Sequence, residues 1–197
     1  VTTCLLADAE GPLWRDARLI DAVDSVVLKA FRESDRGAPP GPLAPQDWFD
    51  SLIADAIAAM GTGKLRVALG SFGYMWTEGT AETINLPFAE AMRLASLHKA
   101  TIAVDATSLN TRITFTNSEG KASEIWLLDA VSLNNQLLSL TRKGASGILW
   151  SVGQEDPAAW DLFARGPDLT PAAPVEAVSF PDVVSYVGSG PFRKVIE

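Results

Sequence analysis

The sequence predicts an α/β protein in which parallel strands are joined by helices. Strand-like and helix-like segments alternate along the chain, an order typical of parallel strands with crossover helices. Residues 147–157 give the clearest signal, because a short apolar strand runs there into a polar, acidic turn and then into a helix start. The loop that follows a strand of a (β/α) barrel has this pattern and faces the substrate.

Four strands are expected, each with the apolar or β-branched composition of a buried strand. After the first strand, residues 14–23 carry apolar side chains near helical spacing. Asp47 is expected to cap a second helix, and Gly61 is placed to end it. A third helix is expected from Val131 and stops at Gly144. The four strands are expected at 2–7, 25–30, 65–69 and 147–150.

The turn after the fourth strand contains residues that are expected to start a helix and residues that are candidates for function. Asp156 is a good N-cap and Pro157 a good first helical residue, so a last helix is expected to begin there. Trp150 and Glu155 then remain at the end of a strand without an evident structural role.

Residues 77–129 interrupt the alternation and predict a small α+β insertion. A turn of glycine and aromatic residues, 70–76, is expected to lead into it. Turn residues between two alternating segments predict a hairpin within it. Its expected elements are a helix over 87–97, a strand at 102–105 and a hairpin of 111–116 with 122–128.

Composition excludes several classes of protein. The chain has 197 residues, enough to bury a sizeable core, and no apolar run long enough to span a bilayer. A net charge of -8 without a basic cluster argues against a nucleic-acid partner. A single cysteine, Cys4, forbids an internal disulfide. A single histidine, His98, expected on a helix surface, argues against a His-based metal site or a Ser-His-Asp triad. We expect neither a metal ion nor a cofactor.

The ends of the chain suggest an excerpt from a longer protein. The sequence begins in a strand without a Met, and it closes with a Pro-rich stretch. The expected parts are a strand and helix unit at 1–76, the insertion at 77–129, a helix, strand and helix unit at 130–166, and a linker or tail at 167–197.

Four segments together resemble family 18 glycoside hydrolases, the chitinase-like (β/α)8 barrels. The similarity is to the domain found in bacterial proteins that also carry a polysaccharide deacetylase and a family 2 glycosyltransferase. It implies that the four strands are barrel strands five to eight, the second half of a TIM barrel, with the insertion before the last strand. The segments are 41–49 (GPLAPQDWF), 69–76 (LGSFGYMW), 124–130 (EIWLLDA) and 149–157 (LWSVGQEDP).

The resemblance leaves the catalytic residues unassigned. In this family the catalytic acid is a Glu that ends an Asp-x-x-Asp-x-Asp-x-Glu motif after the fourth strand, and no such run occurs in this chain. The family's Tyr-Asp pair after the sixth strand falls on Phe31 and Arg32, which supply neither the hydroxyl nor the carboxylate. The substrate-assisted hydrolysis of the family therefore cannot be carried over to this chain.

Sugar binding does carry over. The family's Trp at the end of the eighth strand forms the floor under a sugar ring, and Trp150 takes that place. An indole face suits the axial C–H groups of a pyranose. Tyr74 and Trp76 could extend this platform, or could pack between barrel and insertion. Core packing is the expectation for Trp48, Trp126 and Trp160.

The acidic loop residues have two interpretations. On the barrel reading, Glu33 and Asp35 project toward the same mouth as Glu155 and Asp156, where a pair could act as general acid and base. The preferred interpretation is that Arg32 forms ion pairs with Glu33 and Glu155, and that Lys29 pairs with Glu155 or Glu10. The predicted substrate-binding residues are Phe31, Glu33, Tyr74, Trp76, Trp150 and Glu155.

Two functions remain open. One is a chitinase-like domain, hydrolytic or degenerate, that holds a β-linked amino-sugar chain in polysaccharide synthesis or modification. The other is a non-catalytic carbohydrate-binding or scaffolding module for a deacetylase or glycosyltransferase. The resemblance implies a location outside the cytoplasm, with membrane attachment only through other parts of the parent protein. Because the outer strands would be open edges, we expect a homodimer or association with the missing half of the barrel.

Overall fold

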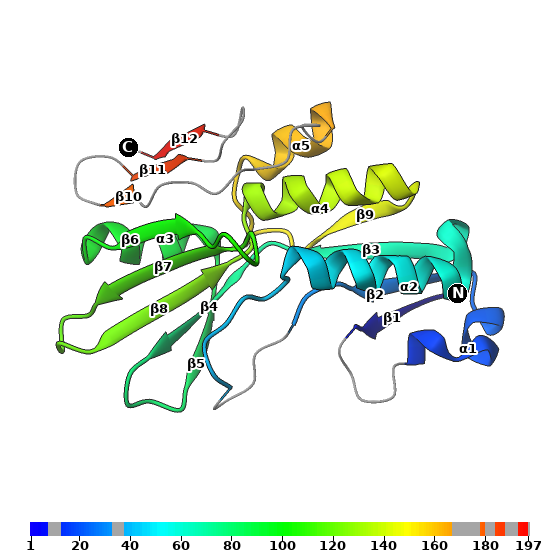
Figure 1. Cartoon of the computed structure of the whole chain (residues 1–197), viewed down its shortest axis with the longest axis horizontal. Coiled ribbons are helices and arrows are strands. Elements are labelled where there is room, and N and C mark those ends of the chain that lie inside the picture. The colour runs from blue at the N-terminus through cyan, green and yellow to red at the C-terminus, as the bar shows by residue number, and fades with distance from the viewer. Residues whose placement is uncertain (8–12, 33–37, 167–177, 180–183, 188–192, 197) are drawn as a thin grey trace.

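The computed structural model describes residues 1–7, 13–32, 38–166, 178–179, 184–187 and 193–196. A four-stranded, fully parallel sheet forms one half of the molecule, in the order β1-β2-β3-β9 (Figure 1). The predicted alternation of strands and helices is therefore confirmed, and β1 and β9 lie at the edges. The strands are β1 (Thr2–Leu6), β2 (Ser25–Lys29), β3 (Leu65–Gly70) and β9 (Ser146–Trp150).

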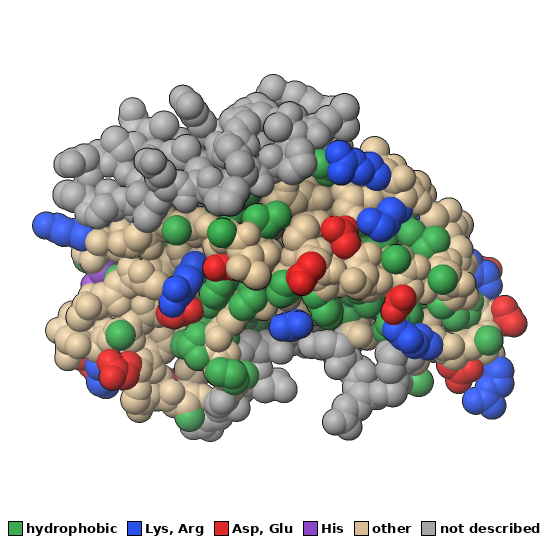
Figure 2. All heavy atoms as spheres, viewed as in Figure 1, with side chains coloured by type: hydrophobic (Ala, Val, Ile, Leu, Met, Phe, Trp, Pro, Cys, Tyr) green, Lys and Arg blue, Asp and Glu red, His purple; other side chains and the backbone are tan. Residues whose placement is uncertain are grey.

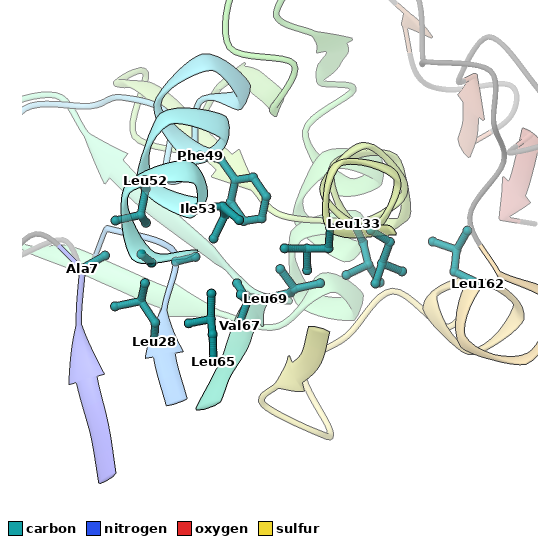
Figure 3. Packing of buried hydrophobic residues seen from close by; sticks show 14 of the residues in the cluster. Ala7, Leu28, Phe49, Leu52, Ile53, Leu65, Val67, Leu69, Leu133 and Leu162 are labelled. Atoms are coloured by element: carbon teal, nitrogen blue, oxygen red, sulfur yellow. The ribbon is translucent and has the colours of Figure 1, made fainter. Parts of the chain in front are cut away.

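Helices cover one face of this sheet. Alternate strand residues such as Leu28, Val67 and Leu69 point toward the helices, because successive side chains of a strand lie on opposite faces. They meet Phe49 and Leu133 in the main hydrophobic core (Figure 3). The helices of this half are a 3₁₀ turn (Leu13–Arg15), α1 (Ala17–Ala22), α2 (Gln46–Lys64), α4 (Ala130–Lys143) and α5 (Ala159–Arg165).

The opposite face of the sheet is less covered. Val27 and Lys29 are half-buried, whereas their neighbours Val26 and Leu28 are fully buried. The edge strand β1, expected to be buried, alternates between exposed and half-buried residues, and Cys4 is exposed. The reason is that β1 has a strand neighbour on one side only.

The insertion forms an antiparallel sheet with α3 against one face, and β10 from the tail adds to its edge, which gives the order β10-β6-β7-β8-β4-β5 (Figure 1). The predicted helix and hairpin are confirmed. His98 is the half-buried C-terminal cap of α3. The elements are β4 (Gly73–Thr77), β5 (Thr83–Leu86), α3 (Phe88–Leu97), β6 (Thr101–Val104), β7 (Thr111–Thr116), β8 (Ala122–Leu127) and β10 (Val178–Ser179).

The expected turn at 70–76 is wrong over most of its length. Residues 73–77 form β4, which pairs with both β5 and β8, so the sheet of the insertion begins at Gly73 rather than at 77. Tyr74 and Trp76 face one side of the sheet and Met75 faces the other. Because both faces carry apolar side chains, the sequence of β4 lacks the polar and apolar alternation by which a strand is recognised. Strand β5 was not predicted either.

The observed helix boundaries differ from the predicted ones at three helices. The helix expected over 14–23 is broken at Asp16, whose carboxylate accepts a hydrogen bond from the backbone of Arg18 and caps α1. Helix α2 begins at Gln46 rather than after Asp47, and Gly61 interrupts it with φ 71° and ψ 164°. Helix α5 begins at Ala159, so Asp156 is not its N-cap.

The tail expected over 167–197 lies largely outside the described residues. Its described segments are β10, which pairs with β6, and the antiparallel pair β11 (Val184–Val187) and β12 (Arg193–Ile196). Among the described helices, none is long and apolar enough to cross a membrane. On the face drawn in Figure 2, basic and acidic side chains are interspersed and neither sign forms a continuous patch.

We expect Gly73→Ala to lower the free energy of unfolding by about 1–3 kcal/mol, the usual cost of forcing extra atoms into a packed interior. A Cβ at this position would lie 2.9 Å from the backbone carbonyl oxygen of Trp126, which cannot rotate away as a side chain can. Urea unfolding would measure the loss. Gly41→Ala is the matched control, because a Cβ there meets nothing within 4 Å. Equal stability of the two variants would contradict the prediction.

Candidate functional site

Trp150 is fixed at the carboxyl end of β9. It pairs in register with Gly70 of β3. Its carbonyl oxygen accepts hydrogen bonds from the backbone N–H of Ser71 at 2.8 Å and from the Ser71 hydroxyl at 3.1 Å. The Trp150–Ser151 peptide bond is cis. The Trp150 side chain is half-buried and packs against a cluster of aromatic and aliphatic side chains on the side of the sheet away from the main core.

Lys29 lies over the Trp150 ring. Its ammonium is 4.6 Å from the ring centroid, a distance at which a cation is attracted to the face of an indole. Strand β3 runs between the two, and its residues in register with them are Ala68 and Gly70. These small residues leave the long lysine side chain a path across the strand. The structure thus shows Trp150 as a contact of Lys29, whereas the predicted partners were Glu155 and Glu10, and Glu10 lies outside the described residues.

Glu155 is held by its own loop. Its carboxylate accepts hydrogen bonds from the Gly153 backbone N–H and, at 3.1 Å, from the Trp160 indole N–H. Burial alone would raise the pKa of Glu155, but these bonds outweigh it and keep the pKa below its ordinary value. A carboxylate of this kind stays ionised near neutral pH and is a poor general acid. Trp160 is 49% exposed, so the expectation that it packs in the core is wrong.

Four aromatic side chains form a row from the end of β2 into the insertion: Phe31, Phe72, Tyr74 and Trp76. Successive ring centroids lie 5.2, 5.6 and 6.2 Å apart. Phe31 is fully buried and offers no face to a ligand, which corrects its assignment as a substrate-binding residue. Trp76 is 8% exposed and donates its indole N–H to the Ala38 carbonyl at 2.8 Å. Tyr74 is half-buried.

Arg32 also has an aromatic contact. Its guanidinium carbon is 5.2 Å from the centroid of the Trp48 ring, which is itself half-buried against the core. The predicted ion pair with Glu33, and the position of Asp35, lie outside the described residues. Core packing was predicted for Trp48, and its contact with the core agrees with that prediction. Core packing was also predicted for Trp126, which is 7% exposed.

Two buried carboxylates at the N-terminus of α4, Asp129 and Asp156, were not predicted to act together. Asp129 accepts hydrogen bonds from the backbone N–H groups of Val131 and Ser132 and caps α4. Asp156 accepts one from the backbone N–H of Ala130 at 3.2 Å, so both carboxylates serve the same helix end. Burial, followed by repulsion from Asp156, raises the pKa of Asp129 to about 7. An Asp directly before an apolar helix, such as Asp129, can be recognised as a cap from the sequence. The second carboxylate, Asp156, comes from a distant part of the chain, so the sequence does not reveal that it serves the same helix.

A large groove lies on the insertion. Its volume is about 1020 Å³, and it runs along β4, β7 and β8 from the loop at Ala38 to the end of α3. Trp76 lines it, whereas Trp150 does not. Within the described part of the chain, no three His, Cys, Asp or Glu side chains are grouped so as to hold a metal ion.

Comparison with known proteins finds similarity to a curated protein and to several solved structures. No family model matches the chain. The Cortical fragment-lytic enzyme of Bacillus subtilis (strain 168) is 28% identical over 152 residues, which is 73% of this chain and 35% of that protein.

Solved structures show the same fold. The spore cortex-lytic enzyme SleL of Bacillus cereus superposes with a TM-score of 0.73 at 20% identity, over 86% of this chain and 41% of that one. A chitinase from Chromobacterium violaceum gives 0.72 at 20% identity, over 84% and 54%. The chain thus spans between a third and about half of the length of these proteins. The α/β fold with parallel and antiparallel sheets and the predicted resemblance to chitinase-like hydrolases are confirmed.

Proposed function

We propose that this chain, which resembles chitinase-like glycoside hydrolases in sequence and fold, is a carbohydrate-binding part of such a protein. Trp150 carries the proposal. It is anchored through its backbone at the carboxyl end of a parallel strand and remains half-exposed beside a lysine. Loops at this end of a (β/α) sheet are where substrates bind. The ligand class that we propose is a β-linked amino-sugar polysaccharide.

The chemistry around Trp150 suits a sugar ring. An indole face packs against the C–H groups of a pyranose, and polar neighbours then recognise its hydroxyls. The Lys29 ammonium lies over one face of the Trp150 ring, so in this proposal the sugar stacks on the other face of the indole. Glu155, held ionised by its loop, can accept hydrogen bonds from the sugar. Tyr74, half-buried against the same cluster as Trp150, would add a second aromatic contact.

The parallel sheet has the size of half a barrel. Four strands with β1 and β9 as edges, together with matches to about half of each solved neighbour, support strands five to eight of a (β/α)8 barrel. Unpaired strand edges seek partners. We therefore propose that the chain forms a homodimer or associates with the other half of a barrel. Light scattering on this chain tests the first possibility, and a strictly monomeric species would contradict it.

The catalytic role belongs to a longer protein in this proposal. The described carboxylate nearest in sequence to Trp150, Glu155, has a lowered pKa, and the chain lacks the family's acidic motif. For the chain taken alone, we therefore propose a binding or scaffolding role. We place the parent protein outside the cytoplasm, as a membrane-bound protein with deacetylase and glycosyltransferase domains. The cortex-lytic names of two relatives support only the extracytoplasmic location.

Titration with N-acetylglucosamine oligomers, followed by tryptophan fluorescence, tests the proposal. We expect Trp150→Ala to weaken binding at least tenfold, about 1.4 kcal/mol, because the stacking surface is lost. Phe163→Ala is the matched control, since it removes an aromatic side chain that is 39% exposed on α5. If both variants bind like the unmodified chain, Trp150 is not the sugar platform.

A further inference from the structure

The loop over residues 151–158, which connects β9 to α5, is attached to the ends of two helices. The backbone N–H of Phe88, at the start of α3, donates a hydrogen bond to the Gln154 carbonyl at 2.8 Å. The backbone N–H of Ala130, at the start of α4, donates one to the Asp156 carboxylate at 3.2 Å. The position of the loop therefore depends on the chemistry at these helix ends.

The attachment to α4 brings two buried carboxylates to one helix end. The Oδ1 atom of Asp129 accepts hydrogen bonds from the backbone N–H groups of Val131 and Ser132, at 2.9 and 3.1 Å. Its Oδ2 atom is buried and has no hydrogen-bond partner among the described residues. A proton on this oxygen makes it a donor. Asp129 and Asp156 are 2% and 1% exposed, so little water screens their repulsion when both are charged.

Asp156 is the charged group that acts on Asp129. Strand β7 contributes the Thr111 hydroxyl, which donates a hydrogen bond to Asp129, whereas the next residue, Arg112, is exposed on the opposite face of the sheet. The single histidine, His98, caps the far end of the ten-residue helix α3, about 15 Å from its start. Burial, followed by the charge of Asp156, raises the pKa of Asp129 to about 7, so the pair loses a proton near neutral pH.

The loop can move more easily than the helix. All residues of α4 over Ala130–Leu140 are buried, whereas Val152 in the loop is 70% exposed. Segments with few buried contacts open at a lower cost in free energy than packed helices do. When both carboxylates are charged, an outward movement of Asp156 into water relieves their repulsion and leaves α4 in the core.

We propose that Asp129 and Asp156 form a proton-controlled latch, which holds the 151–158 loop against α4 while the pair keeps a proton and releases the loop when that proton passes to solvent. The loop begins directly after Trp150. A released loop withdraws the polar neighbours of that residue, so sugar binding should weaken as the pH rises. This consequence rests on the proposed function, whereas the latch itself rests on the two carboxylates and their contacts.

Hydrogen exchange followed by mass spectrometry tests the latch without a ligand. After correction for the intrinsic pH dependence of exchange, amides over 151–160 should exchange about tenfold faster at pH 8 than at pH 6. The reason is that a group with a pKa of about 7 goes from about one tenth to about nine tenths deprotonated over this range. Asp129→Asn should exchange slowly at both pH values, because asparagine can cap α4 without ionising. Amides of β3 should exchange far more slowly than the loop at both pH values, which separates local opening from global unfolding.

Asp161→Asn is the matched control, because it makes the same change at an exposed carboxylate of α5. It should keep the pH dependence of the unmodified chain. Equal exchange of the loop at pH 6 and pH 8 in the unmodified chain would overturn the latch. An unchanged pH dependence in Asp129→Asn, or exchange of the loop at the rate of β3, would also overturn it.

Isothermal titration with the hexamer of N-acetylglucosamine tests the consequence for binding. Its affinity should fall about tenfold from pH 6 to pH 8 in the unmodified chain and stay constant in Asp129→Asn. A loop that responds to pH in a chain that binds no hexamer would overturn the proposed function and leave the latch standing. Hexamer binding with a loop that does not respond would do the reverse. If the loop responds but the affinity does not change, the latch is not coupled to sugar binding.

Discussion

The free energy of unfolding should fall by on the order of 4 kcal/mol as the pH is raised from about 4 to 8. Asp129 is 2% exposed at the N-terminus of α4, and its pKa is raised from 3.8 to about 7. Burial is the main cause and the charge of Asp156 adds to it, while hydrogen bonds from Thr111 and the backbone act in the opposite direction. Each pKa unit corresponds to about 1.4 kcal/mol, which sets the size of the effect.

The direction follows from proton binding. Between about pH 4 and 7 the folded protein keeps a proton on Asp129 that the unfolded chain has released. Since the folded state then binds more protons, raising the pH favours unfolding across this window, and the effect levels off above pH 7. Carboxylates with a lowered pKa, such as Glu90 and Asp105, have the opposite effect. Their contribution is lost only below about pH 4.5, so it does not mask that of Asp129.

Asp129→Asn should remove most of this dependence. Asparagine keeps an oxygen that can cap α4 but does not ionise. Urea unfolding at pH 5, 6, 7 and 8 would show the variant more stable than the unmodified chain at pH 8, with a flatter profile. Asp156→Asn is the companion variant, which should lower the pKa of Asp129 and reduce the slope without abolishing it. The same slope in Asp129→Asn as in the unmodified chain would exclude Asp129 as its source.

Gln136→Met should raise the free energy of unfolding by about 2 kcal/mol. Gln136 lies in the middle of α4 and is 1% exposed. Within the described residues, neither its Nε2 nor its Oε1 has a hydrogen-bond partner. A buried polar group left unsatisfied costs about 1–3 kcal/mol, and methionine has nearly the same shape without polar atoms that need partners. Thermal and urea unfolding would measure the gain.

Gln136→Glu provides the opposite control. It has the same size but places a charge in the same buried position, so it should lower the stability by more than methionine raises it. If the methionine variant is less stable than the unmodified chain, the amide has a role that its surroundings do not show. A gain in both variants would equally contradict the argument, because a buried charge cannot relieve an unsatisfied amide.

Local signals were sufficient for the main elements of the fold. The apolar spacing of α2 and the end of α4 at Gly144 were predicted, because helix periodicity and glycine caps act within one or two turns. Gly61 was expected to end α2, but the helix continues to Lys64 with Gly61 as an interruption within it. The hairpin of β7 and β8 was predicted from its turn residues. In contrast, β4 was taken for a turn. Its glycine is required by the approach of the Trp126 carbonyl, a contact from another strand.

In the candidate site, too, some features were predicted from the sequence and others were not. Sequence reasoning placed Trp150, Tyr74 and Lys29 at strand ends, and the structure brings Trp150 and Tyr74 against one cluster and Lys29 onto the Trp150 ring. It did not find the partners of the charged groups. Arg32 lies over Trp48, and Glu155 accepts a bond from Trp160. Long charged side chains choose among partners that differ by about 1 kcal/mol, so the choice depends on three-dimensional neighbours.

By itself, the sequence determined the alternation of strands and helices, the hairpin of β7 and β8, and the resemblance to chitinase-like hydrolases. Only the tertiary structure decided that Phe31 is buried, that Asp129 and Asp156 share one helix end, and that the insertion carries a groove. Periodicity and capping are properties of neighbours along the chain. Burial, pKa and cavities are instead set by residues that come together only when distant strands and helices pack.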